Sequence, residues 1–299
     1  MTIALENSDA RVEINPQIGG AIARYAFHDR EILRRAPSDA RAVLDLACFP
    51  LVPFVNRIAF GAFRWEGRTI QLRRNFGDHP HVLHGQGWQS AWQIESQSRD
   101  RVVLRFSHEP DDWPWAYAAE ETLALAEAGL QVALSVTNHS DWSMPVSLGF
   151  HPFFPKRTGT HFDARTNGVW LSGGTQLPTA LVAPGRVFDL SPDVALKNAP
   201  FVDNCYTGWQ RTASIQQPED GLRIALSASA EADFLQFFVP VGADYFCAEP
   251  MSAMPDAVNR PEPAQETGLR MLMPGATFSV SMTIAPQDIR RDQAAAPRS

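Results

Sequence analysis

Short runs of alternating apolar and polar residues constrain the fold of this chain more than any other feature. Such alternation sends successive side chains to opposite faces, as in a β-strand with one buried face. The segment 63-FRWEGRTIQL-72 has two alternating runs around Glu66-Gly67-Arg68, which predicts a hairpin with glycine in its turn. The other strands predicted in this way are 101-RVVLRFSH-108, 130-LQVALSVTN-138, 222-LRIALSAS-229 and 277-TFSVSMTI-284.

Helical periodicity is weak by comparison. The best helical candidate, 29-DREILRRA-36, is short and suits a strand equally well. The 23 prolines and 19 glycines favour short elements joined by turns, so we predict an all-β fold. No linker, change in composition or fixed-period repeat divides the chain. We therefore expect one domain over residues 1–286 and a mobile tail over residues 287–299.

Composition limits the partners and the compartment. The formal net charge is −7 and the basic residues are scattered, which argues against nucleic acid and membrane surfaces as partners. No run approaches the roughly 20 apolar residues of a membrane span, and the N-terminus has no signal-peptide pattern. Cys48, Cys205 and Cys247 are widely spaced, which favours reduced thiols in a cytoplasmic protein. The sequence does not indicate an oligomeric state.

Two titratable residues interrupt the strand pattern in apolar surroundings. His151 lies in the aromatic run 148-LGFHPFFP-155, where it is either a packed core residue or part of a site. Arg57 follows Asn56 in 50-PLVPFVNRIAFG-61, and a guanidinium in this setting needs acceptors. A structural ion pair explains Arg57 as well as a ligand contact does.

Three histidines lie within six residues in 79-HPHVLHGQGW-88. His79-x-His81 suggests a metal site, but neither the glutamate of a cupin site nor the aspartate of an HxHxDH metallohydrolase motif follows. We therefore predict no metal site. His84 precedes Gly85, which has no side chain and would let a ligand approach closely.

Two carboxylates lie beside strand-like aromatic runs. Asp203 precedes one of these runs, and Glu249 follows the run Tyr245–Ala248. A lone buried carboxylate is costly unless it is paired or functional. Pro250 and Pro255 predict that the strand stops after Glu249, so that this side chain points into a loop-lined cleft.

A stiff aromatic turn lies near the middle of the chain, where Trp113 and Trp115 flank Pro114. Aromatic faces beside carboxylates, imidazoles and amides suit a sugar, which has apolar C–H faces and hydroxyl edges. We therefore predict that Trp113 or Trp115 lines a sugar pocket. The alternative is that both rings fill the core.

Taken in order, these clusters resemble the aldose 1-epimerase (galactose mutarotase) family. The order of the motifs and the Pro-Asp-Ala-x-Asn ending carry the resemblance, which covers about residues 10–285. It implies a large two-sheet β-sandwich, the galactose mutarotase-like supersandwich. It also implies a sugar substrate whose α and β anomers are interconverted without a cofactor. The matching stretches are 56-NRIAFGAFRWEG-67, 84-HG-85, 148-LGFHPFFP-155, 203-DN-204, 249-EPMSAMPDAVN-259 and 272-LMPGATF-278.

The family pattern implies a role for each matching residue. Glu249 falls at the position of the general base and His151 at that of the general acid. The chain has Glu249-Pro250-Met251 where many members have Glu-Thr-Gln, and Gly85-Gln86-Gly87 replaces the usual double glycine. The resemblance therefore leaves the identity of the sugar open. The positions that would hold the sugar are Asn56, Arg57, His84, Asp203 and Gln236.

Residue chemistry agrees with anomer exchange. A base must take the proton of the C1 hydroxyl while an acid protonates the ring oxygen. An apolar setting would raise the pKa of Glu249 and lower that of His151, unless a carboxylate at Glu249 or Asp203 offsets the second effect. The motifs supply one cation, Arg57, so a neutral aldose is expected.

Other functions stay open from the residues alone. A glycoside hydrolase would use Asp203 and Glu249 as its carboxylate pair and would leave His151 without a chemical role. A non-catalytic sugar-binding protein on the same fold would not need both Glu249 and His151. A metal-dependent sugar isomerase is the third alternative.

Overall fold

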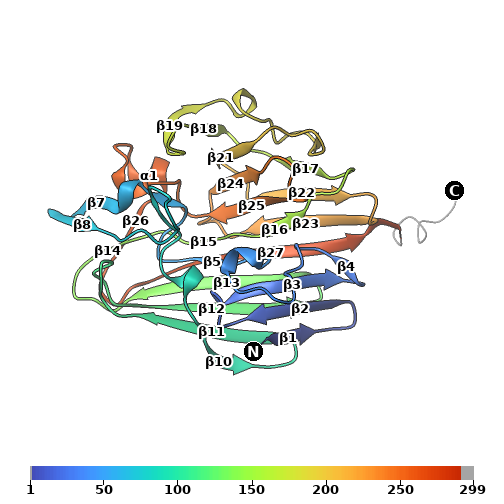
Figure 1. Cartoon of the computed structure of the whole chain (residues 1–299), viewed down its shortest axis with the longest axis horizontal. Coiled ribbons are helices and arrows are strands. Elements are labelled where there is room, and N and C mark those ends of the chain that lie inside the picture. Colours follow the sequence, from blue (N-terminus) through green and yellow to red (C-terminus); the bar gives the residue numbers. More distant parts are fainter. Residues whose placement is uncertain (1, 291–299) are drawn as a thin grey trace.

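Strands are the dominant regular structure in the computed structural model, which describes residues 2–290. Two large antiparallel sheets form the body of the molecule, and a smaller N-terminal sheet lies beside them (Figure 1). This arrangement confirms the predicted all-β sandwich. Within residues 2–290 no helix is both long and apolar enough to cross a membrane.

The larger sheet has nine strands and contains all four of the predicted alternating strands. In β23 (Leu222–Ala228), Leu222, Ile224 and Leu226 are buried and the residues between them are more exposed. Every second side chain therefore faces the core. The nine strands, in spatial order, are β10 (Gln93–Gln97), β11 (Arg101–His108), β12 (Tyr117–Ala126), β13 (Gly129–Asn138), β27 (Thr277–Asp288), β23, β22 (Thr212–Gln217), β17 (His161–Ala164) and β20 (Val194–Ala195).

The second sheet has eight strands and packs against the β17 side of the first. Phe162 of β17 contacts Phe237 and Phe246 of the second sheet, with ring centroids 4.7 and 5.9 Å apart. These rings belong to the apolar layer between the two sheets. The strands, in spatial order, are β19 (Pro178–Val182), β18 (Gly168–Ser172), β21 (Val202–Thr207), β24 (Phe234–Val239), β25 (Tyr245–Met251), β15 (Gly149–Phe150) and β5 (Pro50–Leu51), with β16 (Phe153–Pro155) also paired to β25.

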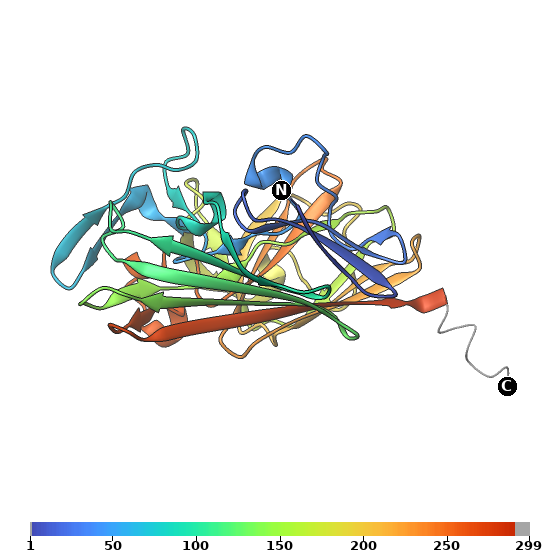
Figure 2. The same cartoon turned by 90° about the horizontal axis from the view of Figure 1, so that it is seen from below.

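The N-terminal sheet lies over the other half of the nine-stranded sheet (Figures 1 and 2). The hydroxyl of Tyr25 donates to the carbonyl of Ile284 in β27 at 3.2 Å, and Arg30 pairs with Asp288 at 2.7 Å. One buried cluster therefore includes residues from Ile3 to Ile284. The strands of this sheet are β1 (Ile3–Glu6), β2 (Ala10–Asn15), β3 (Ala21–Phe27) and β4 (Arg30–Glu31).

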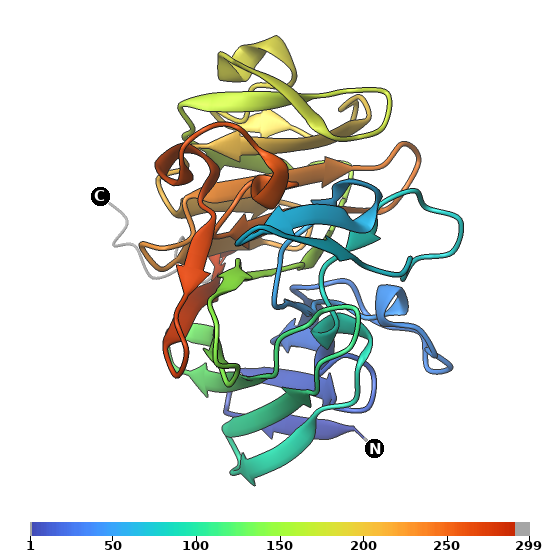
Figure 3. The same ribbon diagram turned by 90° about the vertical axis from the view of Figure 1, so that its left-hand side faces the viewer.

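Small elements close one end of the molecule, which Figure 3 views face on. The paired strands are β6 (Arg57–Ile58) with β9 (Val82–Leu83), β7 (Ala62–Trp65) with β8 (Arg68–Gln71), and β14 (Met144–Val146) with β26 (Arg270–Leu272). The helical turns of the described chain are η1 (Val43–Asp45), η2 (Ala59–Gly61), η3 (Gly87–Gln89), η4 (Pro184–Arg186), η5 (Ala257–Asn259) and the α-helix α1 (Ala264–Thr267).

The structure confirms the four predicted strands and the hairpin, whose turn lies at Glu66 and Gly67. The ambiguous segment 29–36 forms the short strand β4 followed by a bend, not a helix. β27 continues to Asp288 because Gln287 and Asp288 pair with β23, so ordered structure extends past the expected domain end at residue 286. The rest of the expected mobile tail, residues 291–299, lies outside the described residues.

Candidate active site

Strand alternation places polar side chains of β24 and β25 on the face that points away from the core between the sheets. In β24, Phe237 faces the core between the sheets, so Gln236 and Phe238 face the opposite side. In β25, Phe246 and Ala248 belong to that same core, so Glu249 faces the opposite side too. Gln236 and Glu249 are direct partners in the ladder.

The strand that carries Glu249 does not stop there. β25 continues through Pro250 to Met251, and Glu249 is a strand residue that is 1% exposed. The expectation that Pro250 ends the strand was therefore wrong. Pro250 is opposite Leu235 in the ladder, so the strand continues through a residue that has no N–H to donate.

His151 lies opposite Glu249 at the break between β15 and β16. The pairings Gly149–Met251 and Phe153–Cys247 on either side fix this register. Nε2 of His151 is 3.4 Å from Oε1 of Glu249. The imidazole packs against the rings of Phe49 and Phe153, each with its centroid 4.6 Å away. These two rings help to hold the imidazole beside the carboxyl.

Asp203 anchors a second polar group beside this pair. One of its oxygens accepts from Nη2 of Arg57 at 2.8 Å, and the other accepts from Nε2 of Gln236 at 2.6 Å. Nη1 of Arg57 donates to the side chain of Asn56 at 3.0 Å. The ion pair expected for Arg57 therefore exists, and it lies within the site.

His84 and Asn56 reach the site from left-handed backbone conformations. Their φ angles are 58° and 52°, and the N–H of His84 donates to the carbonyl of Asn56 at 2.8 Å. Gly85 also has a positive φ, and a Cβ on it would lie 2.1 Å from the carbonyl oxygen of Val52. Gly85 thus permits close approach of another strand, where the sequence suggested approach of a ligand.

These residues surround a pocket of about 280 Å³, near the lower end of the range for small-molecule sites. Sequence reasoning missed most of its apolar wall. Trp88 and Tyr245 were in quoted segments but carried no motif of their own, Leu44 lies in η1, and Phe76 comes from a loop. The lining residues are Leu44, Asn56, Arg57, Phe76, Leu83, His84, Trp88, His151, Phe153, Asp203, Phe238, Tyr245 and Glu249.

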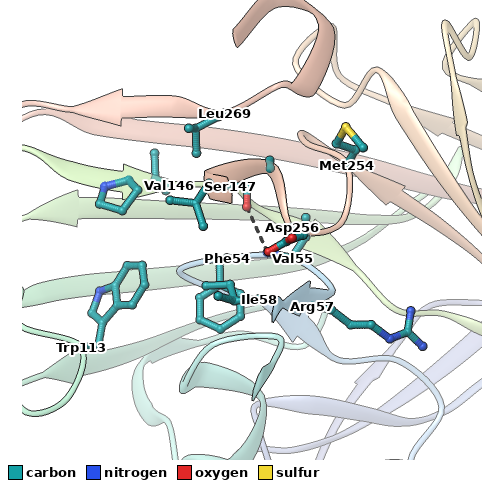
Figure 4. A pocket seen from close by; sticks show the side chains of 13 residues that line it. Phe54, Val55, Arg57, Ile58, Trp113, Val146, Ser147, Met254, Asp256 and Leu269 are labelled. Carbon is teal, nitrogen blue, oxygen red and sulfur yellow. Dashed lines mark hydrogen bonds between the residues drawn. The ribbon is translucent and has the colours of Figure 1, made fainter. Parts of the chain in front are cut away.

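The two tryptophans of the predicted stacking turn do not line this pocket. Trp113 and Trp115 are 1% and 0% exposed, and their rings pack on Phe63. Trp113 borders a separate, much smaller cavity of about 20 Å³, and the guanidinium of Arg57 points away from it (Figure 4). The prediction that either ring faces the sugar pocket is therefore corrected, because both are needed to fill the core.

Burial dominates the electrostatics of the His151–Glu249 pair. It raises the pKa of Glu249 well above the ordinary value, and nearby Asp203 acts in the same direction. It lowers the pKa of His151 to about 3, so the expected offset by a carboxylate does not prevail. Burial likewise lowers the pKa of His84. Burial therefore favours the uncharged forms of both groups, the protonated carboxyl and the neutral imidazole.

The other two histidines of the 79–88 segment, His79 and His81, contact the loop that carries Thr175 and Gln176, next to Arg57. The N–H of Phe60 donates to Nδ1 of His81, so Nε2 of His81 carries the proton and donates to the carbonyl of Thr175 at 2.8 Å. This contact holds the loop whose Gln176 accepts from Arg57 at 3.4 Å. His79 and His81 thus have a structural use.

Within residues 2–290, one group has the composition and spacing of a metal site: His151, Cys247 and Glu249. The ligand atoms of these three residues lie within 4.8 Å of one another. Sequence reasoning missed this group, because strand alternation places Cys247 beside Glu249 without any recognisable spacing motif.

Comparison with known proteins places the chain in a family. The aldose 1-epimerase family profile matches residues 1–285. The uncharacterized protein YphB of Escherichia coli (strain K12) is 33% identical over 298 residues, covering 95% of this chain and 98% of that protein. A candidate aldose 1-epimerase from E. coli K12 has a similar structure, with a TM-score of 0.88, 30% identity and coverage of 96% and 99% of the two chains.

A galactose mutarotase-like protein from Clostridium acetobutylicum shares the fold, with a TM-score of 0.86, 20% identity and coverage of 96% and 95%. The profile match spans nearly the whole chain and includes every residue of the pocket. The chain therefore belongs to the aldose 1-epimerase family.

Proposed function

We propose that this protein is an aldose 1-epimerase, an isomerase that interconverts the α and β anomers of a neutral aldose. The observation that carries the proposal is the 3.4 Å contact between the imidazole of His151 and the carboxyl of Glu249 at the wall of a pocket. These two groups supply the acid and the base that anomer exchange requires.

In the proposed reaction, the carboxylate of Glu249 takes the proton of the C1 hydroxyl while protonated His151 gives a proton to the ring oxygen. The bond between C1 and the ring oxygen breaks, and the open-chain aldehyde forms. After rotation about the C1–C2 bond, the C5 hydroxyl attacks the other face of the aldehyde. His151 then regains its proton and Glu249 returns its own, so the protein ends unchanged.

The number of protons on the pair stays constant through ring opening. Before it, Glu249 is ionised and His151 is protonated; after it, Glu249 is protonated and His151 is neutral. Burial favours the second, uncharged arrangement, as the opposite pKa shifts of the two groups indicate. The pocket therefore favours the proton transfers that open the ring.

The polar residues around the pair are suited to hold sugar hydroxyls. Nε of Arg57 and Nδ1 of His84, two residues that line the pocket, are buried and have no hydrogen-bond partner among the described residues. We assign Asn56, Arg57 and His84 to sugar binding, with Gln236 holding Asp203 in place.

A neutral sugar suits the charge of the residues that line the pocket. Arg57 is the one cation among the residues that line the pocket, and Asp203 already pairs with it at 2.8 Å. A phosphate or sulfonate would need further convergent cations.

The contacts of Asp203 argue against the glycoside hydrolase alternative. Both of its oxygens accept hydrogen bonds, from Arg57 and from Gln236. A hydrolase would need this carboxylate free to act as nucleophile or base. The direct contact of Glu249 with His151 likewise supports a catalytic pair over a purely sugar-binding protein.

Saturation-transfer NMR on a panel of aldoses, at equilibrium between anomers, tests the proposal. We expect the protein to accelerate exchange of at least one neutral aldose, and to prefer it over its 6-phosphate in competition. Exchange at the buffer rate for every sugar in the panel would contradict the proposed activity.

A further inference from the structure

The group formed by His151, Cys247 and Glu249 has the donor set of a site for a soft divalent cation. Cys247 and Glu249 are two residues apart on β25, so their side chains lie on the same face of the strand. His151 meets Glu249 from the adjoining chain, and the three ligand atoms lie within 4.8 Å of one another. We propose that this group binds Zn²⁺ or Cd²⁺ and that the bound ion blocks the pocket.

Charge balance favours such an ion in a buried setting. A thiolate from Cys247 and a carboxylate from Glu249 would together cancel the two positive charges of the cation. Neutral imidazole is the form of histidine that ligates metals. The complex would carry no net charge, so its burial avoids the large cost of an isolated ion.

Two side-chain atoms in this group lack other partners. Oε2 of Glu249 and Nδ1 of His151 are buried and have no hydrogen-bond partner within residues 2–290. A cation would satisfy Oε2 of this carboxyl, whose other oxygen lies 3.4 Å from the imidazole. Sulfur, nitrogen and oxygen ligands together suit zinc and cadmium better than magnesium or calcium.

Three protein ligands leave a fourth position of a tetrahedral site open. His151 and Glu249 both line the pocket, so an ion can enter from it and the fourth ligand can be water. An ion in this position would occupy both groups of the proposed catalytic pair. The inhibition rests on the proposed function, whereas the binding of the ion does not.

Cys205 provides a matched control for Cys247. It is on β21, is 3% exposed, and lies opposite Gln236 in the ladder. Its pKa is raised by burial and by the charge of Glu249, so it shares the surroundings of Cys247 without belonging to the metal-binding group. Cys205→Ser therefore removes a nearby thiol and leaves the proposed ligands intact.

Titration with Cd²⁺ tests the site without reference to activity. The wild-type protein should bind one ion with an ultraviolet thiolate-to-cadmium charge-transfer band. Cys247→Ser should lose this band and bind Cd²⁺ at least about tenfold more weakly, whereas Cys205→Ser should behave as the wild type does. If Cys247→Ser fails to fold by circular dichroism, Cys247→Ala takes its place.

No stoichiometric binding by the wild-type protein, or a band that survives in the Cys247 variant, would overturn the proposed site. In the anomer-exchange assay, Cd²⁺ should inhibit the wild type and a chelator should restore its rate. Binding without any exchange activity would count against the proposed function and leave the metal site standing.

Discussion

Two carboxyl groups of this molecule are almost equally buried, yet their surroundings differ. Glu249, on β25, is 1% exposed. It contacts His151, feels the charge of Asp203 and lines the pocket. Glu121 is 3% exposed on β12, where its ladder partners are Leu104 and Leu134. Burial raises the pKa of both. A raised pKa alone therefore does not identify a catalytic residue.

The difference lies in what each carboxyl can reach. Glu249 can exchange a proton with the imidazole 3.4 Å away and with a ligand in the pocket. Glu121 does not line this pocket. We therefore expect Glu249 to serve catalysis and Glu121 to affect only stability.

Removing the partner of Glu249 should have the largest effect. His151→Asn keeps a similar volume but cannot deliver a proton, so we expect turnover to fall by roughly 10²–10⁴-fold with binding largely retained. The measurement is the rate of anomer exchange as a function of sugar concentration, with a chelator present. A folded variant with a near wild-type rate would make His151 a packing residue.

The pH dependence of the same variant sharpens this prediction. The wild-type pair needs one proton, so its activity should fall as the pH rises through the raised pKa of Glu249 and the pair loses that proton. In His151→Asn the residual activity relies on ionised Glu249 alone. It should rise over that pH range instead, and parallel profiles for the two proteins would contradict the shared-proton account.

Aromatic residues of the core and of the pocket should separate stability from binding. Trp113→Ala should lower the free energy of unfolding by about 3–5 kcal/mol and leave KM unchanged, because the ring lies in the core. Tyr245→Ala, at the pocket wall, should raise KM about fivefold, as expected for the loss of one stacking contact. Urea unfolding and exchange kinetics measure the two quantities. A raised KM in Trp113→Ala alone would reverse the assignment.

Glu121→Gln should change only the pH dependence of stability. The folded protein keeps the Glu121 proton at a pH where the unfolded chain has released it, because burial raises the pKa in the folded state. Stability of the wild type should therefore decrease above the ordinary carboxyl pKa, by up to about 1.4 kcal/mol per pH unit from this group. Urea unfolding of both proteins between mildly acidic and mildly alkaline pH should show a smaller slope for Glu121→Gln. Equal slopes would mean that Glu121 is ionised in the fold.

Local sequence patterns predicted the sheets well, since alternation directly reports which face of a strand is buried. The runs at 101–108 and 130–138 became β11 and β13 for this reason. The segment 29–36 failed to give a clear prediction because apolar spacing in a run so short fits either a strand or a helix. The strand in this segment, β4, depends on pairing with β3, and such a tertiary contact is not visible in the local sequence.

The site was predictable only in part. Motif order identified Glu249, His151, Arg57 and Asp203, and the structure brings these residues together around one pocket. The tryptophans at 113 and 115 were misassigned because a stiff aromatic turn looks the same whether it packs inward or outward. Cys247 was missed because strand alternation places it beside Glu249 without a recognisable spacing motif.

The rates of anomer exchange of the wild type, Glu249→Gln and Glu121→Gln, measured side by side by saturation-transfer NMR, test the central claim most directly. Both substitutions remove a buried carboxyl with little change in volume. The account predicts that Glu249→Gln loses roughly 10²–10⁴-fold in turnover while Glu121→Gln keeps the wild-type rate. Similar losses in both variants, or an active Glu249→Gln protein, would contradict it.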